Sequence, residues 1–232
     1  MPLTLPCLML VTDRLLCGGA DGLIAAVEAA VQGGADAVQL REKDPDGRRL
    51  PPEDLLPLAC RLRQATLGRA VPAGRQALLL VNGPLEVALA SEADGVHLPE
   101  SSPPVRRPRE AVPVGRQGFL VGRSVHSLEA ARRAEAEGAD YLVAGPVYET
   151  RSHPGRKPAG LSLIEEITRS VRVPVLAIGG ISATRAEEVV RAGASGVAVI
   201  SAILAQPDRR AAASDLRRAL DAAWAAVGAA RP

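Results

Sequence analysis

The stretch Gly33–Leu40, written GGADAVQL, recurs in related form at three later points of the chain and decides the fold. The other copies are SEADGVHL (Ser91–Leu98), EGADYLVAG (Glu137–Gly145) and AGASGVAVIS (Ala192–Ser201). Each copy begins with small or glycine residues suited to a helix end, passes Ala-Asp or Ala-Ser, and enters an apolar run. Such a run is typical of a strand buried on both faces of a parallel sheet. The repeat therefore predicts four helix-to-strand junctions.

Four further apolar runs bring the number of predicted strands to eight. They are Leu8–Thr12, Ala77–Asn82, Gly118–Gly122 and Val175–Ile178. Helical patterns lie between most of the strands, the first of them capped by Asp21. Eight strands alternating with helices predict an α/β fold, a single (β/α)8 TIM barrel over residues 1–232, with a C-terminal tail, residues 226–232, that frays. The alternative is an open doubly wound sheet, but no G-x-G-x-x-G follows the first strand.

Composition limits the classes of function. A net charge of +2 and an aromatic content of 2% argue against a nucleic-acid-binding surface. The three cysteines show no CxxC spacing, which fits a reducing cytoplasm and no metal cluster. The apolar N-terminal run is interrupted by Pro6 and ended by Asp13, so we interpret it as a first strand and not a signal peptide. We expect a cytoplasmic protein with no membrane or nucleic-acid partner, associated as a homodimer.

In a barrel of this type the active site is built from the loops that follow the strands, and the last two loops commonly bind phosphate. Gly179 and Gly180 follow the seventh predicted strand, and Ile200 and Ser201 end the eighth. Because glycine has no side chain, backbone N–H groups there can approach an anion. The paired glycines would also suit a plain tight turn. The sequence favours a phosphate site.

Polar side chains alternate in the stretch QLREKD after the second predicted strand. Gln39 and Arg41 are expected to point into the barrel mouth, with Leu40 pointing the other way. An internal salt-bridge layer that joins Arg41 or Lys43 to Glu42 or Asp44 would explain the same residues. The chain contains only two lysines, and Lys43 is one of them, which favours a role for its compact charge at a binding site.

The three histidines receive different interpretations. His126 lies at a strand-to-helix turn, two residues after Ser124, where side chains meet a bound ligand. We interpret it as an acid–base residue, because an imidazole titrates near neutral pH. His97 is interpreted as a core residue with satisfied hydrogen bonds, and His153 as a solvated loop residue.

The motifs at the strand ends resemble those of the thiamine phosphate synthase family over nearly the whole chain. The matching stretches are LVTD (Leu10–Asp13), VQLREKD (Val38–Asp44), ADGVHL, SVHS, EGADYLVAGPVYET, VPVLAIGGIS and GVAVISAI. The resemblance implies one of two activities. One is a magnesium-dependent synthase that joins a pyrimidine diphosphate to a thiazole phosphate, and the other is a thiazole tautomerase that aromatises a carboxythiazole phosphate.

At two positions the sequence differs from the synthase pattern, and these differences decide between the two activities. Gly83 and Ser102 stand where the resemblance places the magnesium-binding aspartates of the synthase. The NG, LP-x-x-S, SVHS and YET patterns are similar to the tautomerase branch. The expected protein is therefore a tautomerase without metal or other cofactor, acting on a phosphorylated thiazole. A synthase is the alternative, and a non-catalytic thiazole-phosphate-binding regulator is a third.

The resemblance also implies roles for individual residues. His126 is the expected catalytic residue, the Gly180 and Ile200–Ser201 backbones hold phosphate, and Thr150, Arg151 and Ser152 meet the thiazole carboxylate. The residues that correspond to the pyrimidine-diphosphate site of the synthase are Gln39, Arg41, Lys43 and Asn82. Their role in a tautomerase is left open.

Overall fold

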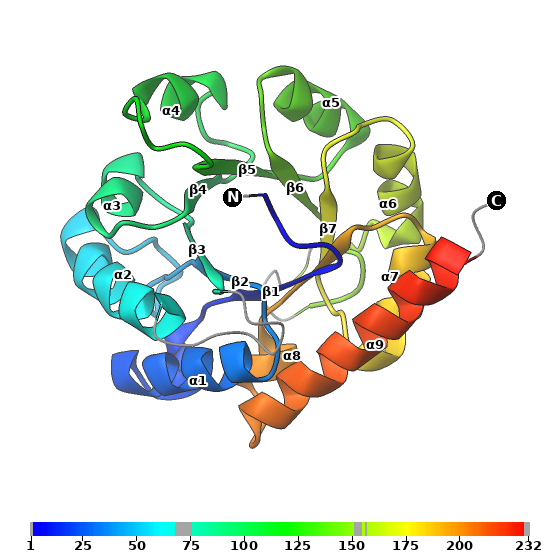
Figure 1. Cartoon of the computed structure of the whole chain (residues 1–232), viewed down its shortest axis with the longest axis horizontal. Helices are drawn as coiled ribbons and strands as arrows, with labels where there is room; N and C mark the ends of the chain where they lie inside the picture. Colours follow the sequence, from blue (N-terminus) through cyan, green and yellow to red (C-terminus); the bar gives the residue numbers. More distant parts are fainter. Residues whose placement is uncertain (1, 68–75, 151–154, 156, 230–232) are drawn as a thin grey trace.

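Eight parallel strands form a closed barrel in which β8 pairs with β1 and every other strand pairs with its neighbours in sequence (Figure 1). The computed structural model of the chain describes residues 2–67, 76–150, 155 and 157–229. The strands are β1 (Cys7–Val11), β2 (Ala37–Leu40), β3 (Leu78–Val81), β4 (Gly95–Leu98), β5 (Leu120–Val125), β6 (Tyr141–Ala144), β7 (Val175–Ile178) and β8 (Gly196–Val199). The predicted (β/α)8 barrel is confirmed.

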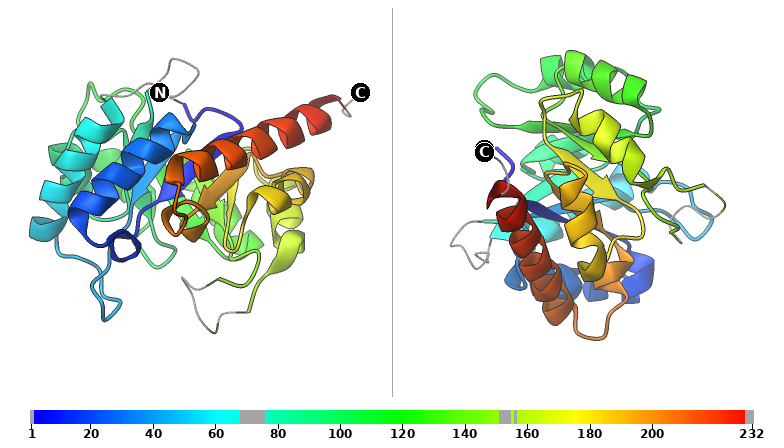
Figure 2. Two further views of the ribbon diagram at one scale, coloured as in Figure 1. Left: turned by 90° about the horizontal axis from the view of Figure 1, so that it is seen from below. Right: turned by 90° about the vertical axis from the view of Figure 1, so that its right-hand side faces the viewer.

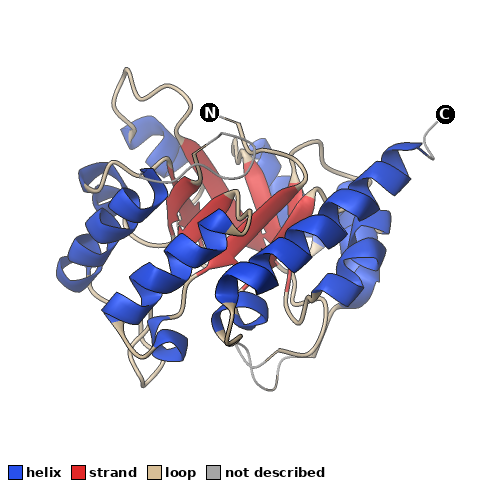
Figure 3. Ribbon diagram, turned by 60° about the horizontal axis from the view of Figure 1, so that its bottom comes forward, coloured by secondary structure: helices blue, strands red, loops and turns tan. Residues whose placement is uncertain are grey.

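Helices surround the strands on the outside of the barrel (Figure 3). They are α1 (Ala20–Gln32), α2 (Pro52–Leu67), α3 (Leu85–Ala90), α4 (Arg106–Ala111), α5 (Leu128–Ala136), α6 (Gly160–Thr168), α7 (Ala186–Arg191), α8 (Ser201–Leu204) and α9 (Arg209–Ala229), with 3-10 turns η1 (Arg14–Cys17) and η2 (Ala183–Arg185). The long α9 crosses the outside of the barrel and packs beside α1 and α7 (Figures 1 and 2). Because α9 continues to Ala229, only residues 230–232 of the expected frayed tail lie outside the described residues.

The strands divide their side chains between two cores, as the two-residue period of a strand requires. In β1, Cys7, Met9 and Val11 point into the barrel and pack with inward residues of the other strands. Leu8 and Leu10 point outward, under the helices. Leu3, in the segment before β1, also packs against the inner core. The inner core therefore fills the N-terminal end of the barrel, and the opposite end carries the strand-end loops.

One predicted strand boundary is wrong in an informative way. The strand predicted to end at Gly122 continues as β5 to Val125, so Arg123 and Ser124 lie within it. Both are polar, yet Arg123 is buried and Ser124 is half-buried, because each finds hydrogen-bond partners from β4 and the loop that follows it. Within the described ranges, no helix has the length and apolar character needed to cross a membrane.

Candidate active site

A cavity of about 760 Å³ opens at the C-terminal ends of the strands, where the fold class places its active sites. The residues around it come mainly from the C-terminal ends of all eight strands and from the loops that follow them. They include Gln39, Arg41, Lys43, Asn82, Ser124, His126, Thr150, Gly179, Gly180, Ile200 and Ser201. Every described residue that the sequence assigned to the site lines this one cavity. Arg151, Ser152 and His153 lie outside the described residues.

One side of the cavity is polar and cationic. Strand alternation sends Gln39, Arg41 and Lys43 into the cavity, as expected from QLREKD. The Asn82 side chain lies between them and Arg49, since Asn82 Nδ2 donates to Gln39 Oε1 (2.7 Å) and Arg49 Nη2 donates to Asn82 Oδ1 (3.1 Å). Burial, together with the charge of Arg41 and then of Arg49, lowers the pKa of Lys43. This side is built to receive negative charge.

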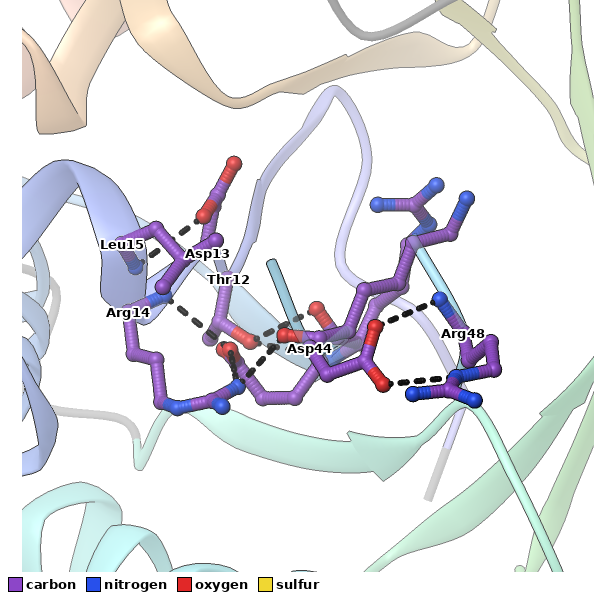
Figure 4. Close-up of polar contacts among 9 residues, drawn as sticks. Thr12, Asp13, Arg14, Leu15, Asp44 and Arg48 are labelled. Atoms are coloured by element: carbon purple, nitrogen blue, oxygen red, sulfur yellow. Dashed lines mark hydrogen bonds and ion pairs between the residues drawn. The ribbon is translucent and has the colours of Figure 1, made fainter. Parts of the chain in front are cut away.

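Residues that follow β1 form hydrogen bonds with the loop after β2, which carries Arg41 and Lys43 (Figure 4). Thr12 Oγ1 accepts from the Arg41 N–H (3.0 Å), and Arg14 Nη1 donates to the Lys43 carbonyl (2.7 Å) and to Glu42 Oε2 (3.2 Å). The buried Glu42 also accepts from the Arg14 backbone N–H (3.0 Å). Burial is the main cause of a raised Glu42 pKa, opposed by these hydrogen bonds. The alternative of a salt-bridge layer through Arg41 or Lys43 is not found among the described residues: Glu42 pairs with Arg14 and Asp44 with Arg48, while Arg41 and Lys43 line the cavity.

His126 follows β5 directly and precedes Ser127, the N-cap of α5, whose hydroxyl accepts from the Ala130 N–H (3.1 Å). Its ring therefore sits at the turn between a strand and a helix, with both neighbours fixed. His126 Nδ1 is hydrogen-bonded to the carboxylate of Glu100, which comes from the loop after β4. The His126 and Glu100 side chains are 28% and 31% exposed, so both face the cavity without being sealed off from it.

Behind Ser124 lies a buried chain of hydrogen bonds. His97 Nε2 is 2.8 Å from Ser124 Oγ, and His97 Nδ1 is 3.1 Å from the Tyr141 hydroxyl. Burial, with smaller contributions from Arg123 and Arg49, lowers the pKa of His97 to about 3. Burial raises the pKa of Tyr141, so its hydroxyl stays protonated. Both rings are neutral at physiological pH, and His97 is the satisfied core histidine that the sequence predicted.

The hydrogens of this chain can be assigned by elimination. Among the described residues, the buried Tyr141 hydroxyl has His97 as its partner, so it donates to Nδ1 to avoid an unsatisfied proton. His97 then carries its hydrogen on Nε2 and donates to Ser124 Oγ. The hydroxyl hydrogen of Ser124 is left to point at a ligand in the cavity. The Ser124 hydroxyl is therefore oriented by His97 to donate a hydrogen bond into the cavity.

The opposite side of the cavity is formed by backbone at the ends of β7 and β8. Gly179 and Gly180 have φ values of +103° and +65°, which favour glycine. A Cβ on Gly180 would lie 2.5 Å from the Glu149 carbonyl oxygen. Both glycines are thus required by the close approach of the β6 loop, so the tight-turn explanation holds whether or not an anion binds. Ser201 faces them as the first residue of the short helix α8.

Three charged residues of the cavity were missed in the sequence. Arg49 returns to the site because the turn after β2 brings it back beside Lys43 in an antiparallel bridge. Glu100 follows β4, and the strand-end rule that identified the other loops would have found it. Arg133 reaches the rim from α5. Among the described lining residues the charges are four cations, Arg41, Lys43, Arg49 and Arg133, and one carboxylate, Glu100.

The fold and this cavity define a (β/α)8-barrel protein in which the charged residues lining the cavity are mainly cationic. Comparison with known proteins gives the family. The family described as "Thiamine monophosphate synthase" matches residues 8–203. A "Thiamine-phosphate synthase" of Methanoculleus marisnigri is 45% identical over 94% of this chain and 97% of its own length. The chain belongs to the thiamine-phosphate synthase family.

Further relatives agree. A "Putative thiamine-phosphate synthase" of Geobacter sulfurreducens is 44% identical over 88% of this chain and 89% of its own length. The solved structure of a thiamine phosphate pyrophosphorylase from Pyrococcus furiosus has a TM-score of 0.78 and 36% identity, covering 94% of this chain and 96% of that one. These findings support thiamine biosynthesis as the context. The relatives' names support the synthase alternative better than the tautomerase expectation and do not distinguish a tautomerase branch.

Proposed function

We propose that this chain is a thiazole tautomerase of thiamine biosynthesis, with His126 as its acid–base residue. The observation that carries the proposal is the set of residues that line the cavity. The His126 imidazole faces a cationic pocket, and the one carboxylate among the described lining residues, that of Glu100, is hydrogen-bonded to His126. Such a site suits proton transfer on a bound anion. In this proposal the cavity binds a phosphorylated thiazole, as the family resemblance implies, and catalyses its isomerisation.

The residues present do not fit the magnesium ion that a synthase of this family would use. Mg²⁺ is held by carboxylates together with substrate phosphates. Gly83 and Ser102 stand at the two positions where the resemblance implies aspartates, and a Cβ at residue 83 would lie 3.1 Å from Leu55 Cδ2. Within the described ranges, no three His, Cys, Asp or Glu side chains gather in an arrangement that could hold a metal ion. No step of the proposed reaction is assigned to a metal.

The proposed reaction moves one proton within the substrate. In the carboxythiazole phosphate, the ring carbon that bears the carboxylate is saturated, and an exocyclic double bond leads to the phosphoethyl arm. His126 removes the proton from that ring carbon, and a proton is returned at the exocyclic carbon, which leaves an aromatic thiazole and no net change in composition. General acid–base assistance of this kind contributes about 10²- to 10⁴-fold to a rate.

The rest of the cavity divides by charge. The backbone around Gly179, Gly180 and Ser201 would hold the phosphate, and Thr150 would meet the thiazole carboxylate. The Ser124 hydroxyl, oriented by His97, would donate to the ligand beside His126. The cationic side formed by Arg41, Lys43 and Arg49 is then assigned no group of this substrate and is left for a product bound in the shared pocket.

The decisive experiment follows the ultraviolet absorbance of the thiazole ring with purified carboxythiazole phosphate as substrate. The parent protein is expected to accelerate aromatisation in the presence of a chelator, and His126→Asn to lower kcat by about 10²- to 10⁴-fold, the range of acid–base catalysis. Glu110→Gln, an exposed change on α4, is the matched control and should match the parent. Turnover by His126→Asn within a few-fold of the parent would remove His126 from the mechanism.

A second candidate, the thiamine-phosphate synthase activity, is favoured by the names of the relatives and by the presence of Gln39, Arg41, Lys43 and Asn82 in the cavity. It is tested with a pyrimidine diphosphate, a thiazole phosphate and Mg²⁺, by detecting thiamine phosphate. We expect no rate above the protein-free blank. A magnesium-dependent rate that disappears on chelation would reverse the order of the two candidates.

A further inference from the structure

Glu100 faces His126 from a different loop, and the contact fixes where the imidazole carries its hydrogen. An ionised carboxylate has only acceptor sites. The hydrogen of the neutral ring therefore lies on Nδ1 and is donated to Glu100 Oε2. This leaves the lone pair on Nε2, which has no hydrogen-bond partner among the described residues. His126 and His97 are then opposite tautomers, since His97 carries its hydrogen on Nε2.

Arg123 holds the loop that carries Glu100. The guanidinium of this buried arginine donates to three backbone carbonyls of that loop, those of Glu100, Ser102 and Pro103, each at 2.7 Å. Arg123 belongs to β5, three residues before His126, and its side chain points outward from the barrel. β5 therefore positions both groups: His126 follows its last residue, and Arg123 within it holds the backbone of Glu100. The rigid guanidinium fork makes such multiple contacts possible.

Other charges around Glu100 secure the same arrangement. Glu100, Arg123, Arg133 and Glu137 line one small recess beside the cavity. Glu137 Oε2 accepts from the Val105 N–H (2.8 Å), which ties down the far end of the loop. Glu100 thus lies near two guanidinium groups and a second carboxylate, in a loop fixed at both ends.

We propose that Glu100 is the positioning residue of His126, held in place by Arg123, and that it selects the tautomer whose Nε2 faces the substrate. The inference rests on the proposed tautomerase function for its kinetic consequence, but its structural content is independent of that function. His126 remains the group that exchanges the proton, and Glu100 acts through it.

The tautomer can be read directly by two-dimensional ¹⁵N–¹H spectra of the uniformly labelled protein at neutral pH. Three histidines give three ring systems, and the His126→Asn spectrum identifies the one of interest. We expect Nδ1 of His126 to be protonated and Nε2 to be unprotonated in the parent. Glu100→Ala should change this pattern to a mixture of tautomers or to predominantly Nε2-protonated imidazole. An unchanged pattern in Glu100→Ala would overturn the proposal.

Kinetics supply the second readout. Glu100→Ala is expected to lower kcat by about 10- to 100-fold, part of the about 10²- to 10⁴-fold that acid–base assistance provides, with KM changed by less than about threefold. Glu100→Gln keeps an acceptor for the Nδ1–H, so it should retain the parent tautomer and more of the activity than Glu100→Ala. Glu110→Gln removes a charge from the same β4-to-β5 connection and should change neither readout. Equal kcat in Glu100→Ala and the parent would contradict the positioning role.

Arg123→Lys tests the support of the loop. A single ammonium cannot serve three carbonyls in the geometry of the guanidinium fork. We expect part of the tautomer change and of the kcat loss of Glu100→Ala, in a protein whose far-ultraviolet circular dichroism matches the parent. If the parent has no tautomerase activity, the proposed function fails and the ¹⁵N spectra alone decide whether Glu100 selects the tautomer. If the parent is active and the spectra of Glu100→Ala match it, the positioning role fails while the proposed function stands.

Discussion

His97 shows how one buried residue can make the stability of the whole protein depend on pH. Its ring is fully buried between Tyr141 and Ser124, and its pKa falls to about 3, mainly through burial. In the unfolded chain a histidine titrates near pH 6.5. Because the folded pKa is lowered, the contribution of His97 to stability is complete above about pH 6.5 and is lost as the pH falls toward 3.

We therefore predict that His97→Gln changes the pH dependence of unfolding. At pH 7 the variant should be less stable by about 2 kcal/mol, since two buried hydrogen bonds are disturbed. Between pH 7 and pH 5.5 the parent should lose about 1 kcal/mol that the variant keeps, because only the parent takes up a proton at residue 97 on unfolding. Urea denaturation of both proteins at the two pH values measures this difference. A gap between parent and variant that is the same at both values would contradict the assignment of a neutral His97.

At the scale of elements, β5 and β6 fit together because a glycine faces a tyrosine. Gly122 pairs with Tyr141 in the register of the two strands, and a Cβ on Gly122 would lie 2.1 Å from Tyr141 Cζ. The Tyr141 ring thus occupies the space that a side chain at residue 122 would fill, and its hydroxyl reaches His97. A larger residue at this position would have to displace a fully buried ring.

Gly122→Ala is accordingly predicted to destabilise the protein by about 1–3 kcal/mol, the usual cost of overpacking a core. It should also disturb the hydrogen bond from Tyr141 to His97, which is visible in the ¹⁵N spectrum of His97. Gly228→Ala is the matched control, because a Cβ there meets no atom within 4 Å. Thermal unfolding of the two variants checks the prediction, and equal midpoints for both would show that Tyr141 has more room than the structure gives it.

The elements also show how far sequence reasoning can go. The repeated phrase around GGADAVQL predicted four strands and separate apolar runs predicted the other four, because buried parallel strands are set by local apolar runs. The end of β5 was wrong because Arg123 and Ser124 are satisfied by partners from other segments, the Glu100–Pro103 carbonyls and His97. The expected Asp21 cap was also wrong, since α1 begins at Ala20 with Gly19 as its N-cap and no side-chain cap.

The candidate site was likewise predicted only in part from the sequence. Strand ends and two-residue alternation were enough to predict that Gln39, Arg41 and His126 meet in one place, and the cavity contains all three. The contacts of these residues with their partners could not be predicted. Arg49 reaches the cavity through a turn, and the contact of Glu100 with His126 joins loops 26 residues apart. Which loop residues meet is a property of tertiary structure.

For the whole molecule, the decisive contact is the one that joins the two ends of the chain. Asp36, just before β2, accepts from the Leu8 N–H of β1 (2.8 Å) and from Arg217 Nη1 of α9 (2.7 Å). Arg217 Nη1 also donates to the Pro6 carbonyl (3.0 Å). The long helix α9 is thus attached to the residues before β1 and β2, and its contact with Asp36 spans 181 residues of sequence. The Arg217 and Asp36 side chains are 15% and 8% exposed, so water screens this pair little.

We predict that Arg217→Met destabilises the protein by about 3–5 kcal/mol, because it removes the Arg217 guanidinium from a buried carboxylate. Arg218→Met is the matched control on the next residue of α9, where the arginine is 77% exposed and pairs with Asp215 at the surface. Its cost should be below about 1 kcal/mol, as for other surface pairs. Urea unfolding followed by circular dichroism measures both. Since α9 packs on α1 and α7, we expect one cooperative transition in each protein, shifted to lower urea only for Arg217→Met; equal shifts for the two variants would mean that α9 is held by its apolar face and not by Asp36.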